Sequence, residues 1–150
     1  EPVRFEGRTY YSFPLPERLA GLSETELMKT RCGYRARYII ETARMVAEGD
    51  VDIYALKGAP SDEALKQLLR LPGVGRKVAD CVLLYSMQKY DAFPVDVWIK
   101  RAMERIYFNG EDTPITKIRD FAQNKFGQWA GFVQHYLFHY TRCCYGEIKG

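Results

Sequence analysis

Apolar residues recur at helical spacing along most of this chain, with polar residues between them. The spacing predicts a short helix from Ser23 to Lys29 and a longer one through Ile39 and Ala47 that ends at Gly49. Two helices joined by a glycine turn follow, in residues 61–88. Further helices are predicted over about 96–109, 113–127 and 132–140. We expect an all-α domain over residues 23–150.

Residues 1–22 break this pattern. Pro2, Gly7, Pro14 and Pro16 stand among aromatic residues, which predicts an extended, irregular lead-in. No convincing strand pair can be read from this segment or from the rest of the chain.

Residues with short polar side chains mark the predicted helix starts. Ser23 and Glu26 form a capping-box pattern. We predict that Ser61 and Asp96 are N-caps, and that Thr113 caps a helix with Pro114 at its first position.

The glycine turn between the paired helices is the first candidate site. We expect the tight reversal to need both Gly73 and Gly75, which also leave backbone N–H groups unobstructed for a phosphate. Four basic residues flank the turn: Lys66, Arg70, Arg76 and Lys77. An ordinary helix–helix turn is the alternative, and the basic flank favours a phosphate site.

Two charged residues near the turn are candidates for catalysis. Lys77 lies in the first turn of its helix, where the helix dipole disfavours a cation and so favours the nucleophilic free amine. Asp96 starts a later helix, and one of its oxygens could cap while the other faces a reacting centre. The alternatives are a solvated surface lysine and a simple N-cap. Asp80, one turn after Lys77 on the same helix, is expected to pair with a basic neighbour.

Three further residues could form a flat pocket. Cys81 shares a helix face with Lys77, and Gln134 and Phe138 share a face of the last helix. A thiol and a ring can stack on a planar base, and an amide can read its edge. Burial in an ordinary core is the alternative for each of them.

Composition and net charge by themselves exclude few classes of protein. The net charge is +3 and the isoelectric point about 8.7, which does not by itself indicate a nucleic-acid partner. Among the four cysteines, Cys143 and Cys144 are adjacent and lack the spacing of a zinc or iron–sulfur site. We therefore expect free thiols in a reducing compartment and no metal site. No apolar run is long enough to span a membrane.

Four ordered blocks of sequence resemble the helix-hairpin-helix base-excision DNA glycosylases, and among them the 8-oxoguanine DNA glycosylase/lyase family. The resemblance covers nearly the whole chain. Its markers are residues 33–38, Leu71 to Cys81, Pro94 to Val97, and Gly131 with Gln134 and Phe138.

The resemblance implies a role for each matching residue. Lys77 would attack the sugar C1′, and Asp96 would stabilise the developing positive charge. Cys81 and Phe138 would sandwich the flipped base, while Gln134 and the Pro94 carbonyl would read its edge. The DNA-binding residues would be Tyr34, Arg35, Gly73, Gly75 and Arg76, with Arg35 facing the estranged cytosine.

The same resemblance implies a bifunctional glycosylase/AP lyase that acts without a cofactor on double-stranded DNA containing an oxidised base. It also implies an intracellular monomer, in the cytoplasm or nucleoid of a prokaryote or the nucleus of a eukaryote, and a chain that is the C-terminal part of a larger enzyme. Two alternatives remain open. One is an endonuclease III-like enzyme for oxidised pyrimidines, which usually carries a C-terminal iron–sulfur cluster. The other is a non-catalytic module that only grips duplex phosphates and needs neither Lys77 nor Asp96.

Overall fold

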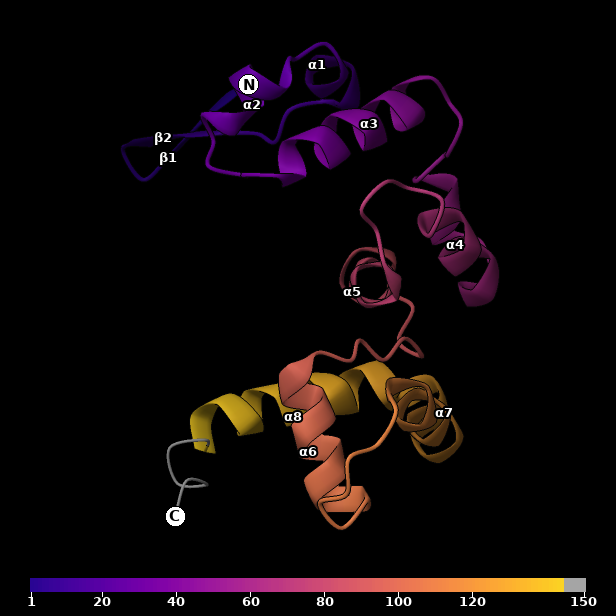
Figure 1. Ribbon diagram of the computed structural model, residues 1–150. Helices are drawn as coiled ribbons and strands as arrows, with labels where there is room; N and C mark the ends of the chain where they lie inside the picture. Colours follow the sequence, from indigo (N-terminus) through magenta and orange to yellow (C-terminus); the bar gives the residue numbers. More distant parts are fainter. Residues whose placement is uncertain (145–150) are drawn as a thin grey trace. The chain divides into compact units, whose positions relative to one another are not determined.

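The computed structural model describes residues 1–144, including the side chains up to residue 143, and is mainly helical (Figure 1). The prediction of an all-α fold class is confirmed. The α-helices are α1 (Pro16–Ala20), α2 (Glu24–Met28), α3 (Arg35–Ala47), α4 (Ser61–Leu68), α5 (Arg76–Met87), α6 (Val97–Tyr107), α7 (Ile115–Phe126) and α8 (Ala130–Cys144). Short 3-10 turns are η1 (Ala55–Lys57) and η2 (Gly127–Trp129), and two strands are β1 (Pro2–Phe5) and β2 (Arg8–Tyr11).

The chain divides into two compact units. The first contains residues 1–53 together with 70–73, and the second contains residues 54–69 and 74–150. The boundary that we predict after residue 22 lies within the first unit.

The predicted irregular lead-in is wrong for much of its length. β1 and β2 form an antiparallel hairpin in which Pro2 pairs with Tyr11 and Phe5 with Arg8. Glu6 and Gly7, between the strands, both have positive φ angles, of 47° and 73°, as a two-residue hairpin turn requires. All eight strand residues are exposed, so no alternation of buried and exposed positions marks these strands in the sequence. α1 then begins at Pro16, which stands at a position where helices tolerate proline.

In the first unit, α1 and α2 both pack against α3. Their buried residues form one cluster: Leu19, Leu27, Ala36, Ile40 and Ala43. The capping box is confirmed, because the Ser23 hydroxyl accepts a hydrogen bond from the Glu26 N–H while the Glu26 carboxylate accepts one from the Ser23 N–H. This cap fixes the start of α2 at the predicted residue.

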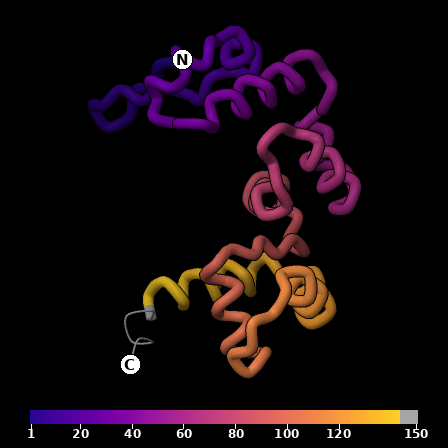
Figure 2. The backbone as a smooth tube through the Cα atoms, in the orientation of Figure 1, coloured from indigo at the N-terminus to yellow at the C-terminus, as the bar shows by residue number. Residues whose placement is uncertain are grey.

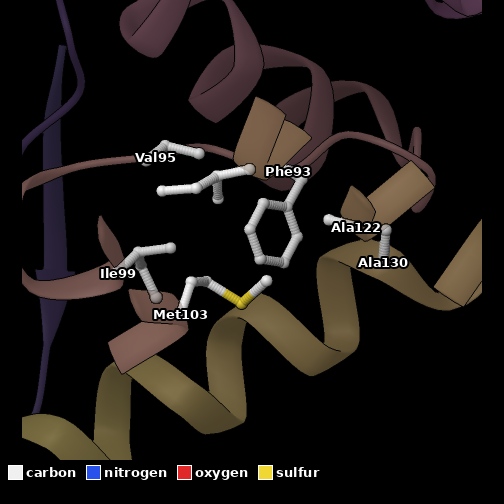
Figure 3. Close-up of a cluster of buried hydrophobic side chains, with 7 residues drawn as sticks. Phe93, Val95, Ile99, Met103, Ala122 and Ala130 are labelled. Carbon is white, nitrogen blue, oxygen red and sulfur yellow. The ribbon is translucent and has the colours of Figure 1, made fainter. Parts of the chain in front are cut away.

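In the second unit, α6 and α7 pack against α8, and Figure 2 follows the chain from α6 through a short loop into α7 and then α8. The Phe93 ring lies among Met103, Ala122 and Ala130 in Figure 3. Val95, Ile99 and Ile118 complete this cluster. The core therefore holds the 93–96 segment, which ends at Asp96, against three helices.

Two predicted N-caps are each wrong by one residue. The N-cap of α4 is Pro60, and the Ser61 hydroxyl instead donates a hydrogen bond to Asp91 at 2.8 Å. The N-cap of α7 is Pro114, while the Thr113 hydroxyl donates to the carbonyl of Glu111. In both cases the hydroxyl donates to an acceptor outside the helix instead of capping the first turn.

Gly131 allows α8 to approach the 90–92 segment closely. Its N–H donates a 2.7 Å hydrogen bond to the carbonyl of Tyr90. A Cβ at this position would lie 2.3 Å from Leu84 Cδ1 and 2.9 Å and 3.1 Å from the carbonyl oxygens of Tyr90 and Ala92. Two of these three atoms belong to the backbone and cannot rotate away.

We therefore expect Gly131→Ala to lower the free energy of unfolding by about 1–3 kcal/mol, the usual cost of overpacking. Urea unfolding measures this value. Gly21→Ala is the matched control, because a Cβ there meets nothing closer than 3.7 Å. Equal stability of the two variants would contradict the close packing of α8.

Candidate active site

The start of α5 presents Lys77 to solvent. Gly75 is the N-cap residue, in an extended conformation, and the helix runs from Arg76. Lys77 is exposed, and among the described residues its ammonium group has no hydrogen-bond or ion-pair partner. An exposed first-turn lysine without a carboxylate partner fits both a nucleophile and a solvated surface residue, so the catalytic role of Lys77 remains a prediction.

The structure requires glycine at only one of the two glycine positions of the turn. Gly73 has a φ of +73°, and a Cβ there would lie 2.6 Å from the ring of Tyr38, so only glycine fits. Gly75 has an ordinary φ of −85°, and a Cβ there would meet nothing within 4 Å. The expectation that the reversal requires both glycines is therefore wrong for Gly75. Its open surroundings leave room for a ligand above the N-terminus of α5.

Arg76 forms an ion pair within the protein. Its Nε donates a 2.9 Å hydrogen bond to Asp80, which is buried, and Arg119 of α7 lies 3.4 Å from the other oxygen of that carboxylate. The predicted pairing of Asp80 with a basic neighbour is confirmed. Burial raises the pKa of Asp80 although both arginines oppose this, and burial lowers the pKa of Arg119. The ion pairs thus offset only part of the cost of burying these charges.

Asp96 is the N-cap of α6, as predicted. Its Oδ1 accepts hydrogen bonds from the N–H groups of Trp98 at 3.0 Å and Ile99 at 2.9 Å. Both bonds go to the same oxygen, and Oδ2 accepts none from the described residues. The helix therefore fixes the carboxylate and leaves one charged oxygen available, which is the arrangement that a combined capping and catalytic role needs.

A chain of hydrogen bonds connects α5, α8 and the 93–96 segment. Gln134, which is buried on α8, donates from Nε2 to the Pro94 carbonyl at 3.2 Å. The Tyr85 hydroxyl donates to Gln134 Oε1 at 3.3 Å and lies 3.5 Å from Nδ1 of His135. The two groups expected to read a base edge, Gln134 and the Pro94 carbonyl, are thus in direct contact.

Tyr85 is the residue that sequence reasoning missed, because its ring fits the apolar pattern of α5. Lys77, Cys81 and Tyr85 follow one another at single-turn intervals and so lie on one face of that helix. That spacing is the signal in the sequence that could have identified it.

Cys81 and Phe138 are partly buried. Cys81 is a free thiol. Phe138 packs against the cluster around Phe93, and the Arg142 guanidinium lies 5.9 Å from its ring centroid. Phe138 thus contributes to the core while retaining some exposed surface, so its predicted stacking role remains a prediction.

Tyr34 and Arg35 belong to the first unit, at the N-terminus of α3. Both are exposed, and the Arg35 guanidinium lies 4.6 Å from the centroid of the Tyr34 ring. The ring also meets Tyr38 edge-on, with centroids 6.4 Å apart. An exposed cation on an aromatic ring suits contact with nucleic acid.

Metal ligands do not gather in the part of the chain that the structure describes: no three His, Cys, Asp or Glu side chains there are placed to hold an ion. Cys32, Cys81 and Cys143 are free thiols, and the side chain of Cys144 lies outside the described residues. No helix in the same part of the chain is long and apolar enough to cross a membrane.

Comparison with protein families identifies the chain. Residues 4–126 match the HhH-GPD superfamily of base excision DNA repair proteins. The chain belongs to this superfamily. The match begins within β1 and runs to the last residue of α7, so it includes the paired helices α4 and α5.

Two curated relatives extend this result. The probable N-glycosylase/DNA lyase of Methanothermobacter thermautotrophicus is 40% identical over 92% of this chain and 50% of its own length. The N-glycosylase/DNA lyase OGG1 of Arabidopsis thaliana is 32% identical over 89% of this chain and 39% of its own length. This HhH-GPD chain thus spans half or less of the length of these relatives.

A solved structure shows the same fold. It is the Clostridium acetobutylicum 8-oxoguanine glycosylase/lyase in complex with double-stranded DNA containing cytosine opposite 8-oxoguanine. That chain superimposes with a TM-score of 0.89 at 39% identity, over 95% of this chain and 49% of its own.

Proposed function

We propose that this HhH-GPD protein is a bifunctional DNA glycosylase/AP lyase that excises 8-oxoguanine from double-stranded DNA. The observation that carries the proposal is the hydrogen-bond chain from Tyr85 through Gln134 to Pro94. It connects the α5 face that bears Lys77 and Cys81 with the segment that ends at Asp96. The names of the relatives and of the solved complex support the same reaction and substrate.

The chemistry assigned to Lys77 begins with attack of its free amine on C1′ of the damaged nucleotide. The bond from Nζ to C1′ forms while the glycosidic bond breaks, and the base leaves with its bonding electrons and takes up a proton. The Asp96 carboxylate stabilises the positive charge that develops on the sugar. Ring opening gives an imine, loss of a C2′ proton expels the 3′ phosphate, and water then releases the lysine.

Recognition of the base is assigned to α5, α8 and the 93–96 segment. A flipped base would stack between Cys81 and Phe138, and Gln134 and the Pro94 carbonyl would bind its edge. Gly73, Gly75 and Arg76 would contact the DNA backbone, and Tyr34 and Arg35 would contact the strand opposite the lesion. The protein would act as an intracellular monomer without a cofactor or an iron–sulfur cluster.

Borohydride trapping on defined duplexes tests the proposal in the full-length protein. We expect a covalent complex with 8-oxoguanine duplexes and the fastest excision opposite cytosine, because Arg35 would hydrogen-bond the unpaired cytosine. Equal excision opposite all four bases would contradict the role of Arg35. Preference for oxidised pyrimidines would support an endonuclease III-like enzyme, and binding without trapping would indicate a non-catalytic module.

Phe138 gives a test of base recognition that is separate from the lysine chemistry. Phe138→Leu keeps an apolar side chain in the core but removes the ring, and a stacked base is worth about 1–3 kcal/mol. We expect single-turnover excision of 8-oxoguanine to slow by about five- to a hundredfold, while trapping at a pre-formed abasic site is unchanged. Phe132→Leu, at an exposed ring on the same helix, is the control. Equal losses on the two substrates would contradict a stacking role.

A further inference from the structure

The side-chain amide of Gln134 can point in two directions, and its surroundings select one. A carbonyl oxygen can only accept hydrogen bonds, so the Pro94 carbonyl requires the NH₂ group on its side. The oxygen of the amide then faces Tyr85, whose hydroxyl donates to it at 3.3 Å. Rotation of the amide by half a turn would place two acceptors against each other at Pro94.

The Tyr85 hydroxyl is suited to donate this bond. Partial burial raises its pKa, and the neighbouring Cys81 and Asp96 raise it further, so the phenol stays protonated at neutral pH. Its ring meets the His135 ring edge-on, with centroids 6.1 Å apart, and Nδ1 of that histidine lies 3.5 Å from the hydroxyl. Two contacts on one side chain restrict its rotation.

We propose that Tyr85 is a positioning residue that holds the Gln134 amide in the orientation that the Pro94 carbonyl requires, and thereby helps to set which edge of a flipped base the protein accepts. Gln134 has one amide hydrogen and one oxygen lone pair left after these bonds. With the amide held, a base must offer an acceptor to the NH₂ and a donor to the oxygen. The effect on base selection rests on the proposed function. The hydrogen bond between Tyr85 and Gln134 can be tested whether or not the protein excises 8-oxoguanine.

Tyr85→Phe removes only the hydroxyl, and Tyr85 is 58% exposed, so the fold loses little. The matched control is Tyr136→Phe on α8, where the side chain is 74% exposed and its hydroxyl has no hydrogen-bond partner among the described residues. In the full-length protein, we expect Tyr85→Phe to slow single-turnover excision of 8-oxoguanine by about three- to tenfold, as for one lost hydrogen bond. Trapping at a pre-formed abasic site should not change.

A double-mutant cycle shows whether Tyr85 acts through the amide. In the Gln134→Ala background, Tyr85→Phe should cause no further loss of excision. A loss of equal size in both backgrounds, or slower trapping at the abasic site, would overturn the proposal and place the hydroxyl in the chemistry of Lys77 instead.

Nuclear magnetic resonance separates this proposal from the proposed function. The side-chain NH₂ signals of Gln134, assigned by their loss in Gln134→Ala, should shift and broaden in Tyr85→Phe and stay unchanged in Tyr136→Phe. Unchanged signals in Tyr85→Phe would overturn the proposal even if the enzyme excises 8-oxoguanine. Shifted signals in a protein that excises another base, or none, would uphold the positioning while the proposed substrate or function fails.

Discussion

Lys77→Gln is expected to abolish the covalent complex that borohydride traps on 8-oxoguanine and abasic duplexes. Glutamine has no amine to attack C1′, so neither the imine nor strand cleavage can form. The side chain is exposed and has no partner in the described part of the chain, so its loss should change the free energy of unfolding by less than about 0.5 kcal/mol. Gel assays of trapping, together with equilibrium binding to the same duplex, measure the two effects.

Lys117→Gln is the matched control for the nucleophile. Lys117 is also exposed, on α7, with its amine 5.6 Å from the Phe108 ring centroid, and its loss should leave trapping unchanged. Persistent trapping in Lys77→Gln would show that another amine attacks the sugar. Loss of both trapping and binding would assign Lys77 to phosphate contact rather than to chemistry.

Asp96→Asn is expected to keep the fold and to lower the rate of base excision by about a hundred- to a thousandfold. Asparagine caps helices about as well as aspartate, and its Oδ1 can accept the same bonds from Trp98 and Ile99. The neutral NH₂ group would replace Oδ2, which accepts no bond from the described residues and carries the charge that would face the sugar. Single-turnover kinetics and thermal unfolding measure rate and stability separately.

Asp96→Ala shows what the cap alone contributes. It should lower the free energy of unfolding by about 0.5–2 kcal/mol through loss of the two N-terminal hydrogen bonds, in addition to slowing excision. If Asp96→Asn instead excises at the normal rate per folded molecule, Asp96 is only a helix cap.

Short-range patterns in the sequence determined much of the fold. Helical spacing identified the segments that become α3 to α8, and the Ser23 capping box and the Asp96 cap are both observed. These features depend on groups within one helical turn, so the sequence contains both partners. The positions of Lys77 and Cys81 on one face of α5 follow from the same periodicity.

Partners distant in sequence decided the rest. Ser61 donates to Asp91, and Gly131 is needed because α8 meets the backbone of Tyr90 and Ala92. Tyr85 contacts Gln134, and Arg119 contacts Asp80, only because α5, α7 and α8 pack in one unit. The β-hairpin was missed because its strands are exposed on all positions and carry no period-two pattern. Local sequence thus determined which residues could act at the site, and the packing of helices decided which of them meet.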